Sequence, residues 1–102
     1  MSAAAEWLRV RLAGAPPELL DAMLAEVGEG AEVPEALASA SVSLYARVLR
    51  GTGGREDAVP LLAADALLTH ALEAQAEADP DGVAELAARW GGAGRLGALA
   101  AE

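Results

Sequence analysis

The sequence predicts an all-α protein, an antiparallel bundle of about five short-to-medium helices. Alanine and leucine fill 43 of the 102 positions, and both residues favour helix strongly. Apolar residues recur at spacings of three and four between breaks made by proline and glycine. No alternating run or hairpin dipeptide indicates a strand. Turns of three to five residues between the predicted helices imply antiparallel neighbours.

The first two helices follow from their end signals. Ser2 is expected to cap a helix that reaches about Leu12, and the glycine and two prolines that follow end it. Pro17 then suits the first turn of a second helix, because the missing N–H costs nothing there. That helix is expected to run to about Val27, where Gly28 and Gly30 stop it.

The third and fourth helices are the longest. Pro34 opens the third, which is expected to end at Arg50 before the glycine-rich segment 51–54. That segment lacks the Lys-Ser/Thr ending of a P-loop and follows no strand, so we interpret it as a flexible turn. Asp57 is expected to cap a fourth helix that continues to about Ala78.

The run Asp79-Pro80-Asp81 predicts a helix restart, with a cap, a proline and an acid in order. The fifth helix is expected to end at Trp90. Residues 1–90 are therefore interpreted as a single α-helical domain, followed by a Gly/Ala-rich tail over 91–102 that is flexible or short-helical. A minor alternative is that this tail docks into a larger scaffold.

Composition limits the function more than it defines it. With 27 alanines and only three aromatic residues, a monomer is expected to have a thin core, since burial scales with apolar area. This favours an oligomer or a complex with another protein over a compact monomer. The net charge of −9 argues against nucleic-acid partners and against anionic membrane surfaces. The chain lacks a predicted signal peptide or membrane span, so a cytoplasmic location is expected.

The residues that could carry chemistry are few. The chain has no cysteine and one histidine, His70, with Glu73 as its only acidic neighbour one turn away. One such pair does not make a metal site, so no metal, cofactor or catalytic residue is predicted. Asp65 lies at the edge of an apolar stripe. A carboxylate there needs a partner, and we expect a buried ion pair with Arg47 or Arg50.

Two apolar stripes are the predicted contact faces, through which the chain is expected to bind a second copy of itself or another protein. Each stripe repeats at helical spacing and is the most apolar face of its helix. The stripe on the third helix consists of Leu37, Leu44 and Val48, and the stripe on the fourth consists of Leu61, Leu68 and Leu72.

The stretch Leu62-Ala63-Ala64-Asp65-Ala66-Leu67-Leu68-Thr69-His70-Ala71 resembles part of the all-α trans-polyprenyl diphosphate synthases, which carry a Gly-Asp-x-Leu-Leu pattern on a helix. Ala64 stands where that family has glycine, and the similar region covers about residues 50–90. The family's two Asp-rich motifs, which hold Mg²⁺ against a diphosphate, are absent from this sequence. The resemblance therefore implies at most a small noncatalytic subunit of a heteromeric synthase.

The leading hypothesis is a noncatalytic helical interaction or oligomerisation protein. The accessory subunit is the alternative.

Overall fold

The all-α prediction is confirmed. A computed structural model describes residues 2–100, and this part of the chain contains six α-helices, two short 3₁₀ turns and no strand. The last two residues of the predicted tail lie outside the described range. In chain order the helices are α1 (Ala3–Arg11), α2 (Pro17–Glu26), α3 (Val33–Leu49), α4 (Ala58–Ala78), α5 (Val83–Trp90) and α6 (Arg95–Ala100).

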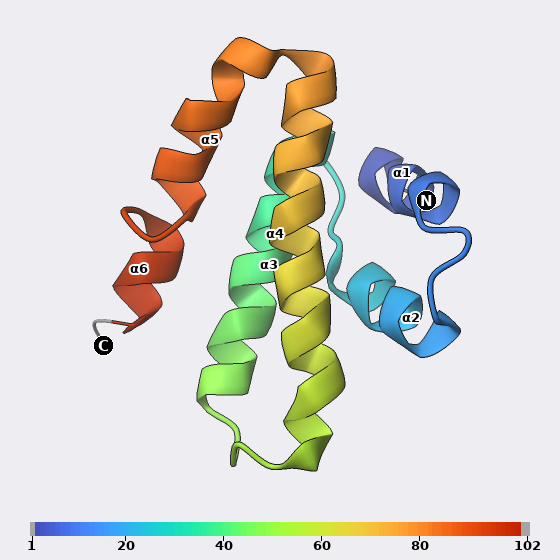
Figure 1. The fold of residues 1–102 in the computed structure, drawn as a ribbon, viewed down its shortest axis with the longest axis vertical. Coiled ribbons are helices and arrows are strands. Elements are labelled where there is room, and N and C mark those ends of the chain that lie inside the picture. The colour runs from blue at the N-terminus through green and yellow to red at the C-terminus, as the bar shows by residue number, and fades with distance from the viewer. Residues whose placement is uncertain (1, 101–102) are drawn as a thin grey trace.

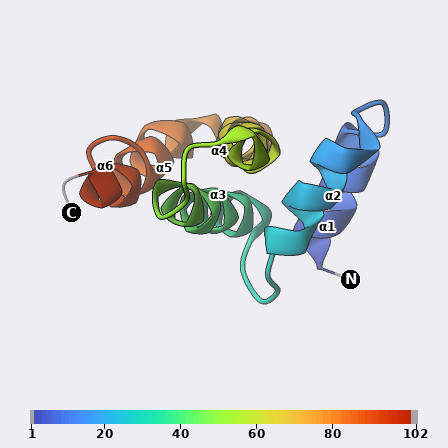
Figure 2. The ribbon, with the colours of Figure 1, turned by 90° about the horizontal axis from the view of Figure 1, so that it is seen from below.

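The antiparallel pair α3 and α4 forms the centre of the molecule (Figure 1). On one side α5 returns antiparallel to α4, and α6 continues beside α3. On the other side α1 and α2 cross the hairpin steeply rather than running along it, as the view along its axis shows (Figure 2). The bundle therefore has a central hairpin with one pair of short helices on each side.

Two of the expected caps hold their helix starts. The Ser2 hydroxyl accepts the N–H of Ala5 at 3.0 Å, and the Asp79 carboxylate accepts the N–H of Asp81 at 3.1 Å. Asp57 was expected to cap α4, and that prediction is wrong. Its backbone is already helical, and its carboxylate accepts the Gly53 N–H at 2.8 Å instead.

The core is built largely from alanine. Eight of its fourteen buried apolar residues are alanines, and α3 and α4 contribute seven of the eight. Small side chains let the two backbones approach closely, so that the Ser41 side chain reaches the backbone of α4. Its hydroxyl is fully buried on α3 and donates to the Ala64 carbonyl of α4 at 2.7 Å. We call this contact zone between α3 and α4 the seam.

The tail is helical where it is described. After the glycines that follow Trp90, the chain forms α6, which packs on α3 and α5. The short-helical alternative is therefore the one found for residues 95–100. Trp90 helps to fix this side of the molecule, because its Nε1 donates to Glu35 of α3 at 2.8 Å and Arg95 lies over its ring.

Candidate functional site

The predicted contact stripes mostly form the interior of the monomer. Leu37 and Leu44 are buried in the core. Three more residues of the two stripes are half-buried, namely Val48, Leu68 and Leu72. Helical periodicity correctly identified which face of each helix is buried. The face is buried by other helices of the same chain, however, and not by a second protein. As an interface between proteins, the stripe of α3 is therefore a wrong prediction, and only Leu61 of the α4 stripe is exposed.

The predicted ion pair of Asp65 is also wrong. Asp65 is exposed on α4, and its side chain forms no ion pair within residues 2–100. Arg47 pairs with Glu26 of α2 instead. Arg50 is exposed at the end of α3 and likewise has no carboxylate partner in the described chain. The helix turns Asp65 outward, away from the seam that buries Ala64 and Leu67.

Three leucines are uncovered where α3 ends and α4 begins. The exposed fractions are 62% for Leu49, 58% for Leu62 and 42% for Leu61. Figure 1 shows that the turn between α3 and α4 projects beyond α2 on one side and α6 on the other, although Leu99 near the end of α6 lies close to Leu49. We call Leu49, Leu61 and Leu62 the hairpin-tip surface.

Sequence reasoning missed Leu49 and Leu62, although one signal was present. Leu61 and Leu62 are adjacent, and neighbours on an α-helix point about 100° apart. Both could not face a narrow seam. A hollow of about 240 Å³ lies beside Leu49, bounded by Ala46, Arg50 and Leu99 of α6. Apolar side chains and a shallow recess therefore occur at the same end of the hairpin.

The loop at the tip is held by its own polar groups. The Gly53 N–H donates to Asp57, and the Thr52 hydroxyl donates to Glu56 at 2.6 Å. That hydrogen bond lowers the pKa of Glu56. Gly53 has a φ of +76°, which favours glycine at this position. The N–H groups of Gly53 and Gly54 thus bond to Asp57 and Thr52 of the loop itself and are not offered to a phosphate.

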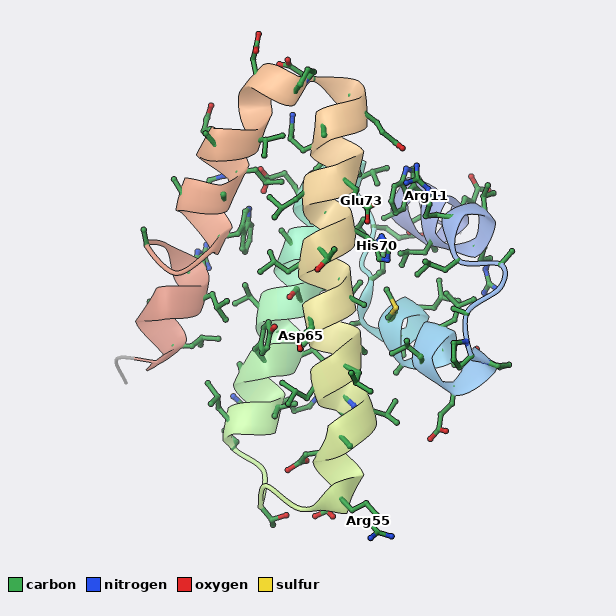
Figure 3. The ribbon with its side chains drawn as sticks, in the orientation of Figure 1. Arg11, Arg55, Asp65, His70 and Glu73 are labelled. Carbon is green, nitrogen blue, oxygen red and sulfur yellow. The ribbon has the colours of Figure 1, made fainter. Side chains whose placement is uncertain are left out.

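The single histidine belongs to the contact between α1 and α4. The His70 side chain is 18% exposed, and its ring lies 6.0 Å from that of Trp7. Its Nδ1 is 2.6 Å from Glu73, yet this buried nitrogen forms no hydrogen bond with any group of residues 2–100. Figure 3 shows Arg11, His70 and Glu73 gathered between the two helices.

Arg11 completes this contact. It lies over the Trp7 ring at 4.5 Å and pairs with both Glu73 and Glu77 of α4. Its hydrogen bond to Glu77 raises the pKa of Arg11 and lowers the pKa of Glu77. Arg11, Glu73 and Glu77 thus attach α1 to the hairpin, whereas His70 contacts α1 through its ring.

No set of three or more potential metal-ligating side chains gathers within the described residues. None of the helices in that range is both long and apolar enough to cross a membrane. No family model matches the chain, and neither a curated protein nor a solved structure matches it.

Proposed function

We propose that this chain is a noncatalytic helical interaction protein that binds a protein partner through the hairpin-tip surface, and that it does so in the cytoplasm. The observation that carries the proposal is the exposure of three leucines at the end of the hairpin where α3 stops and α4 begins. Surface leucines are common singly, whereas clustered ones mark contact sites more often.

Energetics supports a partner for this surface. Fully burying a leucine is worth about 1.5–3 kcal/mol, so covering three that are each about half exposed contributes roughly 3 kcal/mol. Binding must also offset the lost freedom of two molecules. The three leucines are therefore suited to be the centre of a larger contact, with the hollow beside Leu49 and the surrounding polar groups as its rim.

The charged groups support a structural role over a catalytic one. Three of the seven arginines pair with carboxylates of other helices: Arg11 with Glu73 and Glu77, Arg47 with Glu26, and Arg89 with Glu35. These pairs attach α1, α2 and α5 to the central hairpin.

Site-specific photo-crosslinking tests the proposal. A benzoylphenylalanine is placed at Leu62 in the full chain, expressed in the cells that naturally make it, and a matched variant carries it at Ala84, which is exposed on α5. We expect a discrete protein adduct from position 62 after irradiation and none from position 84. Equal labelling at both positions, or no adduct at either, would contradict the proposal.

An accessory role in a heteromeric polyprenyl diphosphate synthase is the second candidate. It is favoured by the position of the resembling segment, since Leu62 begins that segment and also belongs to the hairpin-tip surface. In this case the adduct at position 62 contains a large helical protein with Asp-rich motifs. An adduct with any other protein decides against it.

A further inference from the structure

Two charged residues flank the leucines of α4, and neither has an ion-pair partner among residues 2–100. Arg55 stands just before α4 and Asp65 lies two turns into it, and both are exposed. Figure 3 shows Arg55 at the lower end of α4 and Asp65 higher on the same helix. A free cation and a free anion therefore lie on either side of Leu61 and Leu62.

The spacing of these groups is self-complementary. Arg55 opens the 3₁₀ turn Arg55–Asp57 and Asp65 lies on α4, ten residues later in the chain, so the two are about 16 Å apart along the chain's rise, with Pro60 at the midpoint. When two copies of a helix pack antiparallel about a two-fold axis at that midpoint, each residue before the axis faces its counterpart after it. Arg55 of each copy then lies opposite Asp65 of the other, and Leu62, which lies on the same face of α4 as Asp65, meets the partner copy near the centre.

We propose that the partner of the hairpin-tip surface is a second copy of this chain, packed α4 against α4 in an antiparallel two-fold dimer with two intermolecular Arg55–Asp65 ion pairs. This inference rests on the proposed function and specifies its partner. The arrangement has an apolar centre and a charged rim, which is the usual organisation of a protein interface.

The distribution of charge favours contact at this end. Residues 47–65, which include both Arg55 and Asp65, contain three arginines, two aspartates and one glutamate, a net charge of zero, so the rest of the chain carries the whole charge of −9. Two molecules of this protein repel each other over most of their surfaces. At physiological salt the repulsion is screened beyond about 8 Å, so a dimer joined at the tips keeps the acidic ends of the two copies apart.

A charge-reversal cycle in the full chain tests the inference. Sedimentation velocity is measured up to about 1 mM protein for the wild type, Arg55→Glu, Asp65→Arg, and an equimolar mixture of the two variants. Arg9→Glu and Glu18→Arg, at exposed positions on α1 and α2, are the controls because they change the net charge equally. Circular dichroism confirms that each variant is folded.

We expect the wild type to dimerise and each single reversal to raise the Kd about tenfold, because two attractive pairs become repulsive in every dimer. In the mixture, both pairs of the heterodimer are again opposite in sign, so association should return to within about threefold of wild type. The controls should dimerise like the wild type.

Three results would overturn the inference: a wild type that is monomeric throughout, single reversals no weaker than the controls, or a mixture no stronger than its components. A monomeric wild type that still forms an adduct with a different protein at position 62 removes the second copy as partner and leaves the proposed function standing. The absence of both dimer and adduct removes both.

Discussion

The buried hydroxyl of Ser41 offers the sharpest test of how the seam is held together. Ser41 of α3 is fully buried, and its hydroxyl donates to the Ala64 carbonyl of α4 at 2.7 Å. Ser41→Ala removes this bond with little change in volume. Ser43→Ala makes the same substitution two residues later on the same helix, where the side chain is exposed.

The difference between the two variants isolates the hydrogen bond. A buried hydrogen bond contributes about 1 kcal/mol net to stability, whereas alanine is a better helix former than serine by about 0.5 kcal/mol. Ser43→Ala should therefore stabilise the fold by about 0.5 kcal/mol. Ser41→Ala combines this gain with the lost bond and should be destabilised by a similar amount. The two variants should differ by about 1 kcal/mol.

Urea denaturation followed by circular dichroism measures that difference, at one fixed and dilute protein concentration. In thermal unfolding the same difference corresponds to about 4–8 °C in Tm for a domain of this size. A Ser41→Ala protein as stable as Ser43→Ala would refute the reasoning, because it would mean that the hydroxyl contributes nothing to the contact between α3 and α4.

Three further outcomes are expected. Arg11 lowers the pKa of Glu77 in the folded protein. The pair therefore stabilises the fold fully above about pH 4.5, and this stabilisation is lost as the pH falls through the lower folded-state pKa. Glu77→Gln should accordingly flatten the acid side of a curve of Tm against pH. Asp79→Ala removes the cap of the turn that precedes α5 and should cost about 0.5–2 kcal/mol in urea denaturation. Leu62→Ala should change the unfolding free energy of dilute protein by less than about 0.5 kcal/mol, whereas Leu67→Ala, at a fully buried position, should cost about 2–5 kcal/mol; equal effects of the two leucines would contradict the exposure found for the hairpin-tip surface.

The helices could be predicted because their signals are local. Pro17 begins α2 as expected, and the Asp79 cap lies where the sequence indicates a restart. The cap prediction for Asp57 was wrong because a carboxylate just before a helix can accept hydrogen bonds from two sets of donors. These are the first N–H groups of the helix and the N–H groups of the preceding loop. The positive φ of Gly53 turns its N–H toward Asp57, and the loop is the target found.

The candidate site could be predicted less well, because periodicity does not say which molecule covers an apolar face. Leu37 and Leu44 repeat as an interface residue would, yet they are buried within the chain. Arg47 was an acceptable partner for Asp65 by helix position, but Glu26 of α2 lies closer to it once α2 packs on the hairpin. Such pairings depend on how helices distant in the sequence are arranged, and no local pattern encodes that.

The alanine-rich seam links the stability of the monomer to the proposed contact at its tip. Each buried alanine contributes little apolar area to the core. Burying the exposed leucines of the hairpin-tip surface would therefore add substantially to the apolar area that stabilises the fold. A partner that binds only the folded chain stabilises it by mass action, by about 2.7 kcal/mol at one hundred times the Kd. Raising the protein concentration should therefore raise the Tm of the Ser41→Ala variant. Adding Leu62→Glu to that variant should abolish this concentration dependence, because the new charge disrupts the contact at the hairpin-tip surface. Leu62 is exposed and lies outside the seam, so the substitution leaves the core of the monomer intact. A Tm independent of concentration in both proteins would show that self-association does not contribute to the stability of this fold.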